Sequence, residues 1–150
     1  MFRHILVPTD GSALSARAMK LAVKLARSGK ARITFFHVVS PFRPVDYMDG
    51  MLPAHPELFS EAAYRRAAEN DAQRMLAKAV AHARAAKVPC EARTAYEDPP
   101  WKAIVRTARS RGCDLILMAS HGRRGIEGVL LGSEANKVLT HSKIPVLISR

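Results

Sequence analysis

Short apolar runs alternate with longer amphipathic segments along this chain. Between the runs, apolar residues recur at the three- and four-residue spacing that is typical of helices. This alternation predicts one α/β domain over residues 1–150, with a parallel sheet covered by helices on both faces. The predicted strands are residues 4–7, 32–39, 90–95, 114–118 and 144–149. The predicted helices are residues 12–27, 60–87, 100–111 and 133–141.

Residues at the ends of these segments agree with the pattern. Ser12 is a favourable N-cap for the first helix, and Pro100 suits the first turn of the third. Pro145 cannot donate a hydrogen bond to a sheet, so we expect it at the start of a strand or on an edge. The residues of the first helix that are predicted to face the core are Leu14, Ala18, Leu21, Ala22 and Leu25.

The stretch from Met118 to Val138 contains four of the eight glycines. A predicted strand, a glycine-rich loop and a helix follow one another here, and we expect Ser133 to cap this helix. Glycine lets backbone N–H groups approach a ligand closely, and a helix start favours phosphate. We therefore predict that the N–H groups of Gly132 and Ser133 face phosphates. Alternatively, the glycines only form a tight turn and a close contact between helix and sheet.

Two polar residues follow predicted strands. Asp10, after the first strand, would either cap the next helix, which the helix dipole favours, or accept hydrogen bonds from a ribose. We favour the role in ligand binding. For His37, near the end of the second strand, we expect a packed and hydrogen-bonded histidine without a chemical role.

Two motifs resemble those of the universal stress protein family. Pro8-Thr9-Asp10 follows the first strand, and G-x-x-G-x9-G-[S/T] reads here as Ala119 to Gly122, nine further residues and Gly132-Ser133. Alanine replaces the first glycine, and its methyl group would either crowd a ligand or be tolerated. The resemblance covers nearly the whole chain. It implies a Rossmann-like, three-layer fold with strand order 3-2-1-4-5, similar to that of the adenine nucleotide alpha hydrolases.

That strand order makes the first and fourth strands neighbours, so Asp10 and the glycine-rich loop would form one site at the strand carboxyl ends. The resemblance implies ATP as ligand, with the backbone of Val38 against adenine and Asp10 on the ribose. A Mg²⁺ ion would be carried mainly by the phosphates, because Glu127 is the only acidic residue of the loop. The expected nucleotide-binding residues are Pro8, Thr9, Asp10, Val38, Met118, Ala119, Gly122, Arg123, Gly132, Ser133 and Glu134.

No residue resembles a dedicated catalytic base or a metal ligand of the protein itself. The expected function is accordingly that of a cytoplasmic, ATP-binding module in a stress response. Two alternatives stay open, namely slow hydrolysis of ATP at the same site and a nucleotide-free interaction protein.

The formal net charge of +11 raises the question of an anionic partner. The excess lies in the outer thirds, with 8 basic and 3 acidic residues in 1–50 and 9 and 3 in 101–150. The sequence lacks helix-turn-helix spacing and zinc signatures, so we predict that this charge serves anionic ligands and not nucleic acid. No apolar run reaches the length of a membrane span, and no secretory signal is evident. Cys90 and Cys113 form no CxxC motif, which fits a reducing cytoplasm.

Two further expectations concern surfaces. The apolar last strand would leave an exposed edge, so we predict a homodimer through Ile144 to Arg150. The resemblance implies the same, because members of the family commonly pair through this strand. Residues 40–58 contain four prolines and are predicted to form a long loop or lid. Its apolar side chains would cover a pocket or a partner surface, or fold back on the core.

Overall fold

The computed structural model describes residues 1–43, 60–122 and 131–150 of the chain. In chain order the elements are β1 (His4–Pro8), α1 (Ala13–Gly29), β2 (Arg32–Val39), α2 (Glu61–Ala85), β3 (Cys90–Tyr96), α3 (Pro100–Ser110), β4 (Leu115–Ala119), α4 (Ser133–His141) and β5 (Val146–Ser149). The five strands are parallel in the order β3-β2-β1-β4-β5. The predicted three-layer fold and its strand order are confirmed.

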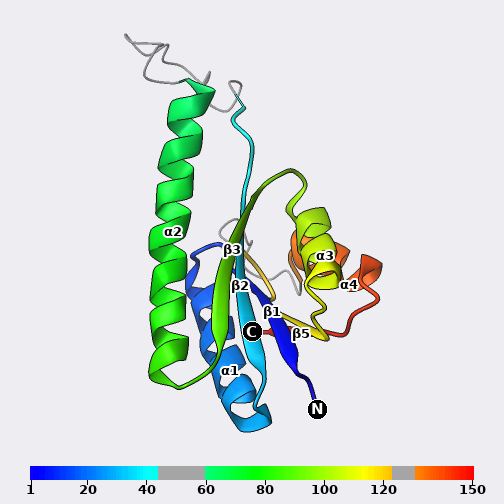
Figure 1. Cartoon of the computed structure of the whole chain (residues 1–150). Helices are drawn as coiled ribbons and strands as arrows, with labels where there is room; N and C mark the ends of the chain where they lie inside the picture. The colour runs from blue at the N-terminus through cyan, green and yellow to red at the C-terminus, as the bar shows by residue number, and fades with distance from the viewer. Residues whose placement is uncertain (44–59, 123–130) are drawn as a thin grey trace.

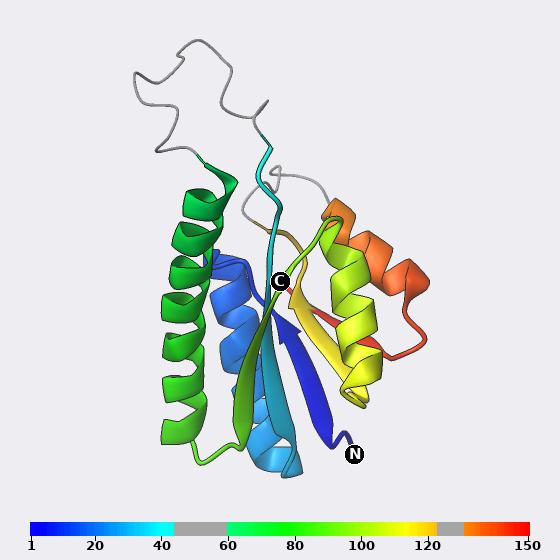
Figure 2. The same ribbon diagram turned by 45° about the horizontal axis from the view of Figure 1, so that its top comes forward.

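The two faces of the sheet carry separate cores, because successive side chains of a strand point to opposite faces. Val7, Phe35 and Leu117 pack beneath α1 and α2, and their neighbours Leu6 and Phe36 pack with α3 and α4 on the other face. Figure 1 shows the two pairs of helices on either side of the sheet. β1 and β4 are parallel neighbours, so their carboxyl ends lie side by side (Figure 2). The loops that follow these two strands therefore start close together.

The first helix shows how small residues fix the position of an element. The Ser12 side chain accepts a hydrogen bond from the Ser15 N–H at 3.1 Å, which confirms the predicted N-cap. Ala18 and Ala22 are fully buried, and these small side chains bring α1 close to the sheet. The prediction that Leu25 faces the core is wrong, because it lies on the flank of this buried alanine stripe and is 41% exposed.

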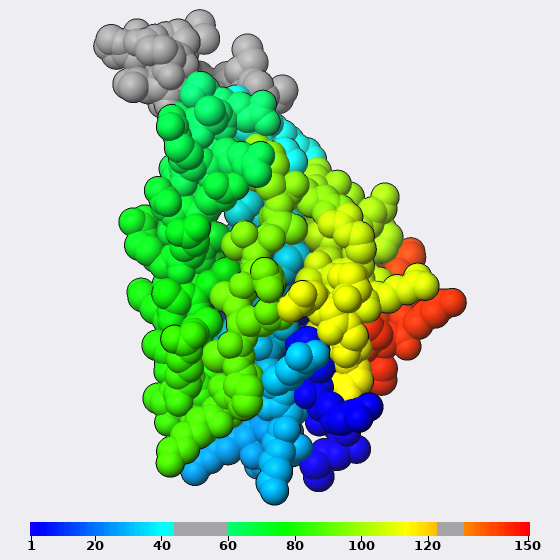
Figure 3. Space-filling view, viewed as in Figure 1, coloured from blue at the N-terminus to red at the C-terminus, as the bar shows by residue number. Residues whose placement is uncertain are grey.

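Both edges of the sheet are defined by the structure. β5 begins at Val146, two residues later than predicted, because Pro145 has no N–H to donate to the neighbouring strand. The Pro145 carbonyl still accepts a hydrogen bond from the Ile116 N–H at 2.9 Å. At the other edge, the middle of β3 is exposed. Figure 3 shows β3 at the surface between α2 and α3.

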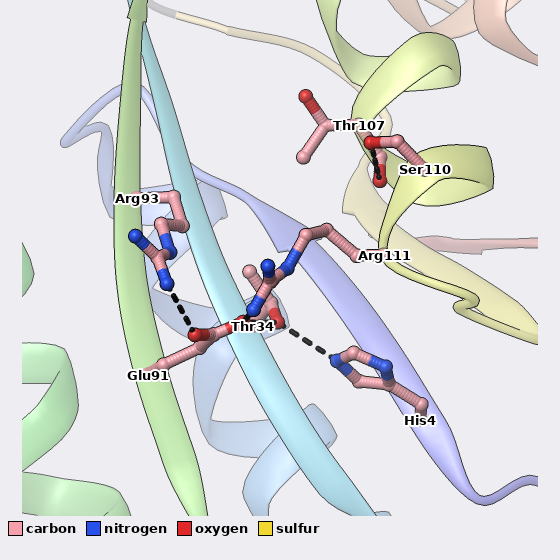
Figure 4. A network of polar contacts seen from close by, with 7 residues as sticks. All are labelled: His4, Thr34, Glu91, Arg93, Thr107, Ser110 and Arg111. Atoms are coloured by element: carbon pink, nitrogen blue, oxygen red, sulfur yellow. Dashed lines mark hydrogen bonds and ion pairs between the residues drawn. The ribbon is translucent and has the colours of Figure 1, made fainter.

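A polar network that extends from the core to the surface joins three strands near their amino ends (Figure 4). Thr34 is fully buried in β2, and its hydroxyl donates to Glu91 Oε1 at 3.0 Å. His4 Nε2 lies 2.8 Å from the same hydroxyl oxygen. Glu91 also accepts hydrogen bonds from Arg93 and from Arg111, which follows α3. This network therefore links β1, β2, β3 and the end of α3. It lies at the amino ends of the strands, opposite the carboxyl ends where the loops after β1 and β4 begin.

Candidate functional site

Asp10 and Gly122 come from distant parts of the chain and meet at the carboxyl ends of β1 and β4. A Cβ atom added at Gly122 would lie 2.6 Å from Asp10 Oδ2, closer than real Cβ contacts allow. Only glycine therefore leaves the carboxylate in its place. Glycine at this position also allows close approach of a ligand to the backbone beside an acidic group.

The segment before Asp10 is held by hydrogen bonds to neighbouring elements. The Thr9 N–H donates to the Phe36 carbonyl at 2.8 Å, and His37 Nδ1–H donates to the Thr9 carbonyl at 2.7 Å. The Thr9 hydroxyl donates to Ser15 Oγ at 3.0 Å. Each polar group of Thr9 is thus engaged within the protein, so this residue positions Asp10. The expectation of a packed, hydrogen-bonded His37 is confirmed.

The two carboxylate oxygens of Asp10 face different parts of the site. Oδ1 accepts a hydrogen bond from the Ser12 N–H at 3.0 Å, which orders the turn before α1. Because Ser12 itself is the N-cap, Asp10 supports the helix start without capping it. Oδ2 lies toward Gly122. The carboxylate therefore has one oxygen that shapes its own loop and one that faces the loop after β4.

The start of α4 differs from the sequence prediction. Gly132 is the N-cap residue, and the exposed Ser133 is the first residue of the helix, so the prediction that Ser133 caps it is wrong. The Gly132 N–H donates to the Ser120 carbonyl at 2.7 Å, so the prediction that this N–H faces a phosphate is wrong. A Cβ at Gly132 would lie 3.1 Å from that carbonyl oxygen. A side chain here would press on the backbone of its own loop.

His121 is a residue of this site that the motif analysis did not single out. Its Nδ1 lies 3.1 Å from Ser120 Oγ, and its ring edge faces Gly132. Its Nε2 is buried, and no described residue forms a hydrogen bond with it. A buried polar atom without a partner is uncommon and indicates a place where a further group can bind. The sequence feature that could have identified His121 as a site residue is its position directly before Gly122.

Glu134 is directed away from the loop after β1. Its Oε2 accepts a hydrogen bond from the Trp101 N–H at 2.8 Å, in the first turn of α3. Pro99, the N-cap residue of α3, provides no side-chain cap. Lys137 Nζ lies 3.5 Å from the other oxygen of Glu134. The carboxylate thus caps α3 from α4, an interaction between helices that the local sequence did not reveal.

The remaining described residues of the expected site lie in or beside the core. Pro8, Met118 and Ala119 are buried in their strands, so they would reach a ligand mainly through their backbone. The Ala119 methyl group belongs to the core beneath α1. Val38 is half-buried against the core on the α3 side.

Some expected groups lie outside the described residues, namely Arg123, Glu127 and the apolar side chains of the predicted lid. Within residues 1–43, 60–122 and 131–150, no three His, Cys, Asp or Glu residues gather in a way that would hold a metal ion. No helix of this part is long and apolar enough to cross a membrane. Burial raises the pKa of Cys113 to about 11 and also raises that of Cys90, so neither is an activated thiol.

The whole chain, residues 1–150, matches the model of the universal stress protein family. It is 33% identical to universal stress protein MJ0531 of Methanocaldococcus jannaschii, over 99% of this chain and 82% of that protein. Its fold is similar to the solved structure of MJ0577 of the same organism, with a TM-score of 0.82 and 23% identity over 99% and 96% of the two chains. A universal stress protein solved in complex with cAMP has a TM-score of 0.71 and 29% identity, over 99% and 97%.

Proposed function

Because the chain belongs to the universal stress protein family, we propose that it binds ATP between the loops after β1 and β4. The observation that carries this proposal is the contact between Gly122 and Asp10, where a Cβ would lie 2.6 Å from the carboxylate. The cAMP complex of a relative of similar fold supports an adenine nucleotide as the ligand class. In this proposal the protein is a cytoplasmic, nucleotide-dependent module of a stress response.

The proposed contacts follow the order of the elements at the sheet edge. The backbone of Val38 contacts adenine, and Asp10 accepts hydrogen bonds from the ribose hydroxyls. Gly122 and the exposed Ser133 at the start of α4 bind the phosphates, since N–H groups at a helix start attract anions. The buried Nε2 of His121 supplies one further partner for a phosphate or for an ordered water. A Mg²⁺ ion is carried mainly by the phosphates.

The phosphate part of the site is tested by titration with ATP, AMP and adenosine in a calorimeter. We expect ATP to bind roughly tenfold more tightly than AMP, because each charge-assisted hydrogen bond to the added phosphates contributes about 1.5–3 kcal/mol. The Glu134→Gln variant is the matched control, because this carboxylate is directed to Trp101. Its ratio of ATP to AMP affinity should equal that of the wild type. Equal affinities of the wild type for ATP and AMP would contradict the phosphate role of the loop.

We also propose a homodimer through residues 144–150. β5 is at the edge of the sheet and pairs with β4 alone among the described strands. Leu147 is 39% exposed in this strand, and Leu139 of the adjacent α4 is 46% exposed. Exposed apolar side chains beside an unpaired strand edge are features of a surface that another chain covers.

The Leu147→Asp variant tests this interface. We expect a dimer of the wild type, and a dissociation constant roughly a hundred- to ten-thousandfold higher in the variant, because each of the two leucines, one from either subunit, contributes about 1.5–3 kcal/mol when buried. Sedimentation equilibrium measures both constants. Ala92→Asp is the control, since Ala92 is exposed on the opposite edge strand β3. A wild type that stays monomeric at tens of micromolar, or equal effects of both substitutions, would exclude this interface.

A further inference from the structure

A hollow of about 250 Å³ lies where α1 and α2 end. Its lining residues lie just before β2 and β3, at the amino ends of these strands. Asp10 and Gly122 follow the carboxyl ends of β1 and β4, so they lie at the opposite end of the parallel sheet. Figure 1 shows how the strands run between these two ends. Its lining includes three basic residues, Arg27, Lys30 and Lys87, and small apolar residues such as Ala31 and Val88. None of its lining residues is acidic.

Two of these basic residues have an unusual backbone conformation. Lys30 has φ 54° and Lys87 has φ 59°, and they are the two non-glycine residues with positive φ in the described part of the chain. Lys30 directly follows α1, whereas Lys87 lies after Ala86, the C-cap residue of α2. Glycine is the usual residue at left-handed positions after helices, because a Cβ is unfavourable there. Both lysines nevertheless line one hollow. This suggests that a positive charge at these positions is more important for the function of the hollow than an unstrained backbone. Strained positions of this kind often occur at binding sites.

The positive charge of the hollow is not neutralised by nearby carboxylates. Ion pairs among the described residues use other basic side chains, so Arg27, Lys30 and Lys87 have no carboxylate partner there. The sequence of α1 contains no acidic residue, and neither does the segment 73–89. The lining of the hollow itself therefore carries only positive charge, which favours the binding of anions.

The helix dipoles alone do not account for these charges. The carboxyl end of each helix carries roughly half a negative charge. The three full positive charges of the lining therefore exceed what would neutralise the carboxyl ends of α1 and α2. The carbonyl groups of the last turns are also engaged. The Ala26 carbonyl accepts from the N–H groups of Lys30 and Ala31, and the Ala83 carbonyl accepts from the Val88 N–H. Few acceptors are thus left to oppose an anion in the hollow.

We propose that this hollow binds a phosphate group, either of a small soluble compound or of a lipid headgroup. The guanidinium of Arg27 suits two phosphate oxygens at once, and the two lysines add point charges. A water molecule occupies about 30 Å³ in the liquid, so a hollow of this size holds a phosphate together with part of its organic group. Ala86 and Pro89, the more exposed apolar residues of the lining, would contact that group. This site is independent of the one proposed for ATP.

The test follows the amide signals of Ala31 and Val88 by NMR during titration of the full chain with glycerol 3-phosphate. These local signals separate the hollow from binding near Asp10. We expect saturable shifts at both amides. Lys30→Gly and Lys87→Gly should each weaken the affinity roughly tenfold, the loss expected for one charge-assisted contact. Their melting temperatures should be unchanged or higher, because glycine suits the left-handed backbone.

Two controls make the outcome decisive. Lys24→Gln removes one exposed charge from α1 outside the lining, and Lys30→Arg keeps the charge; both should bind like the wild type. Vesicles with and without phosphatidic acid distinguish a lipid headgroup from a soluble phosphate, and either source supports the proposal if Lys30→Gly weakens the binding roughly tenfold. Absence of shifts with both probes, or equal losses for Lys24→Gln and Lys30→Gly, would overturn it. So would binding of a nucleic acid that depends on Lys24 as much as on Lys30.

Discussion

Gly122→Ala should weaken ATP binding roughly ten- to hundredfold and leave the fold intact. The added Cβ would lie 2.6 Å from Asp10 Oδ2, so the carboxylate must move away from its position. Asp10 is half-buried in the loop after β1, outside the strand itself, so we expect its side chain to move and the sheet to stay in place. The lost interaction is a hydrogen bond from the ribose to a charged group, worth about 1.5–3 kcal/mol.

A double-mutant cycle decides whether this effect passes through Asp10. Asp10→Ala should weaken ATP binding by a similar factor, because it removes the same carboxylate. The double variant Gly122→Ala with Asp10→Ala should bind no more weakly than Asp10→Ala alone, since the obstacle to the added methyl group is gone. Calorimetry gives the four affinities, and thermal melting shows whether the variants are folded. Fully additive losses would mean that the two residues act separately.

The order and type of the elements could be predicted from the sequence because each strand and helix carries its own local signals. Ser12 before α1 and Pro100 at the start of α3 fixed helix starts through the chemistry of one residue each. The strand order 3-2-1-4-5 came from resemblance to a family, since periodicity alone does not distinguish parallel arrangements. The prediction for Leu25 was wrong because helical spacing identifies an apolar stripe along α1 but does not show which side of that stripe packs against the sheet.

The site was predictable only in part, because its geometry depends on contacts between distant residues. Asp10 and Gly122 were expected in one place, and the structure brings them together. The hydrogen bond from the Gly132 N–H to the Ser120 carbonyl joins residues twelve positions apart, and no local rule anticipates it. Glu134 was expected among the nucleotide-binding residues, whereas in the fold its side chain caps the neighbouring helix α3 at Trp101.

The polar network at the amino ends of the strands fixes the protonation state of His4. The single hydrogen of the Thr34 hydroxyl is donated to Glu91, so His4 must donate its Nε2–H to the Thr34 oxygen. His4 Nδ1 then carries a lone pair, which is buried without a hydrogen-bond partner among the described residues. A second proton would have to sit at this buried atom. Burial, and secondarily the positive charge of Arg32, accordingly lower the pKa of His4 below its usual 6.5.

This lowered pKa predicts that the folded protein loses stability as the pH falls from 7 to 5. Below pH 6.5 the unfolded chain protonates His4 while the folded chain still resists it, so protons favour unfolding. The loss from one such group is at most about 1.4 kcal/mol per pH unit, and it ends once the pH is below the folded pKa. Glu91 has a lowered pKa because hydrogen bonds from Arg111, Thr34 and Arg93 outweigh its burial. Its own contribution to stability is lost only below about pH 4.5, outside this window.

Urea unfolding at half-unit steps between pH 7 and 5 measures this dependence. The His4→Gln variant keeps an N–H donor for Thr34 but does not titrate, so its free energy of unfolding should change less over this range than that of the wild type. His82→Gln is the control, because His82 is exposed on α2 and outside the network; its curve should run parallel to the wild type. If His4→Gln and the wild type lose stability equally between pH 6.5 and 5, the acid sensitivity does not come from His4. In that case the buried imidazole would be accepting its second proton without cost, contrary to the arrangement around Thr34.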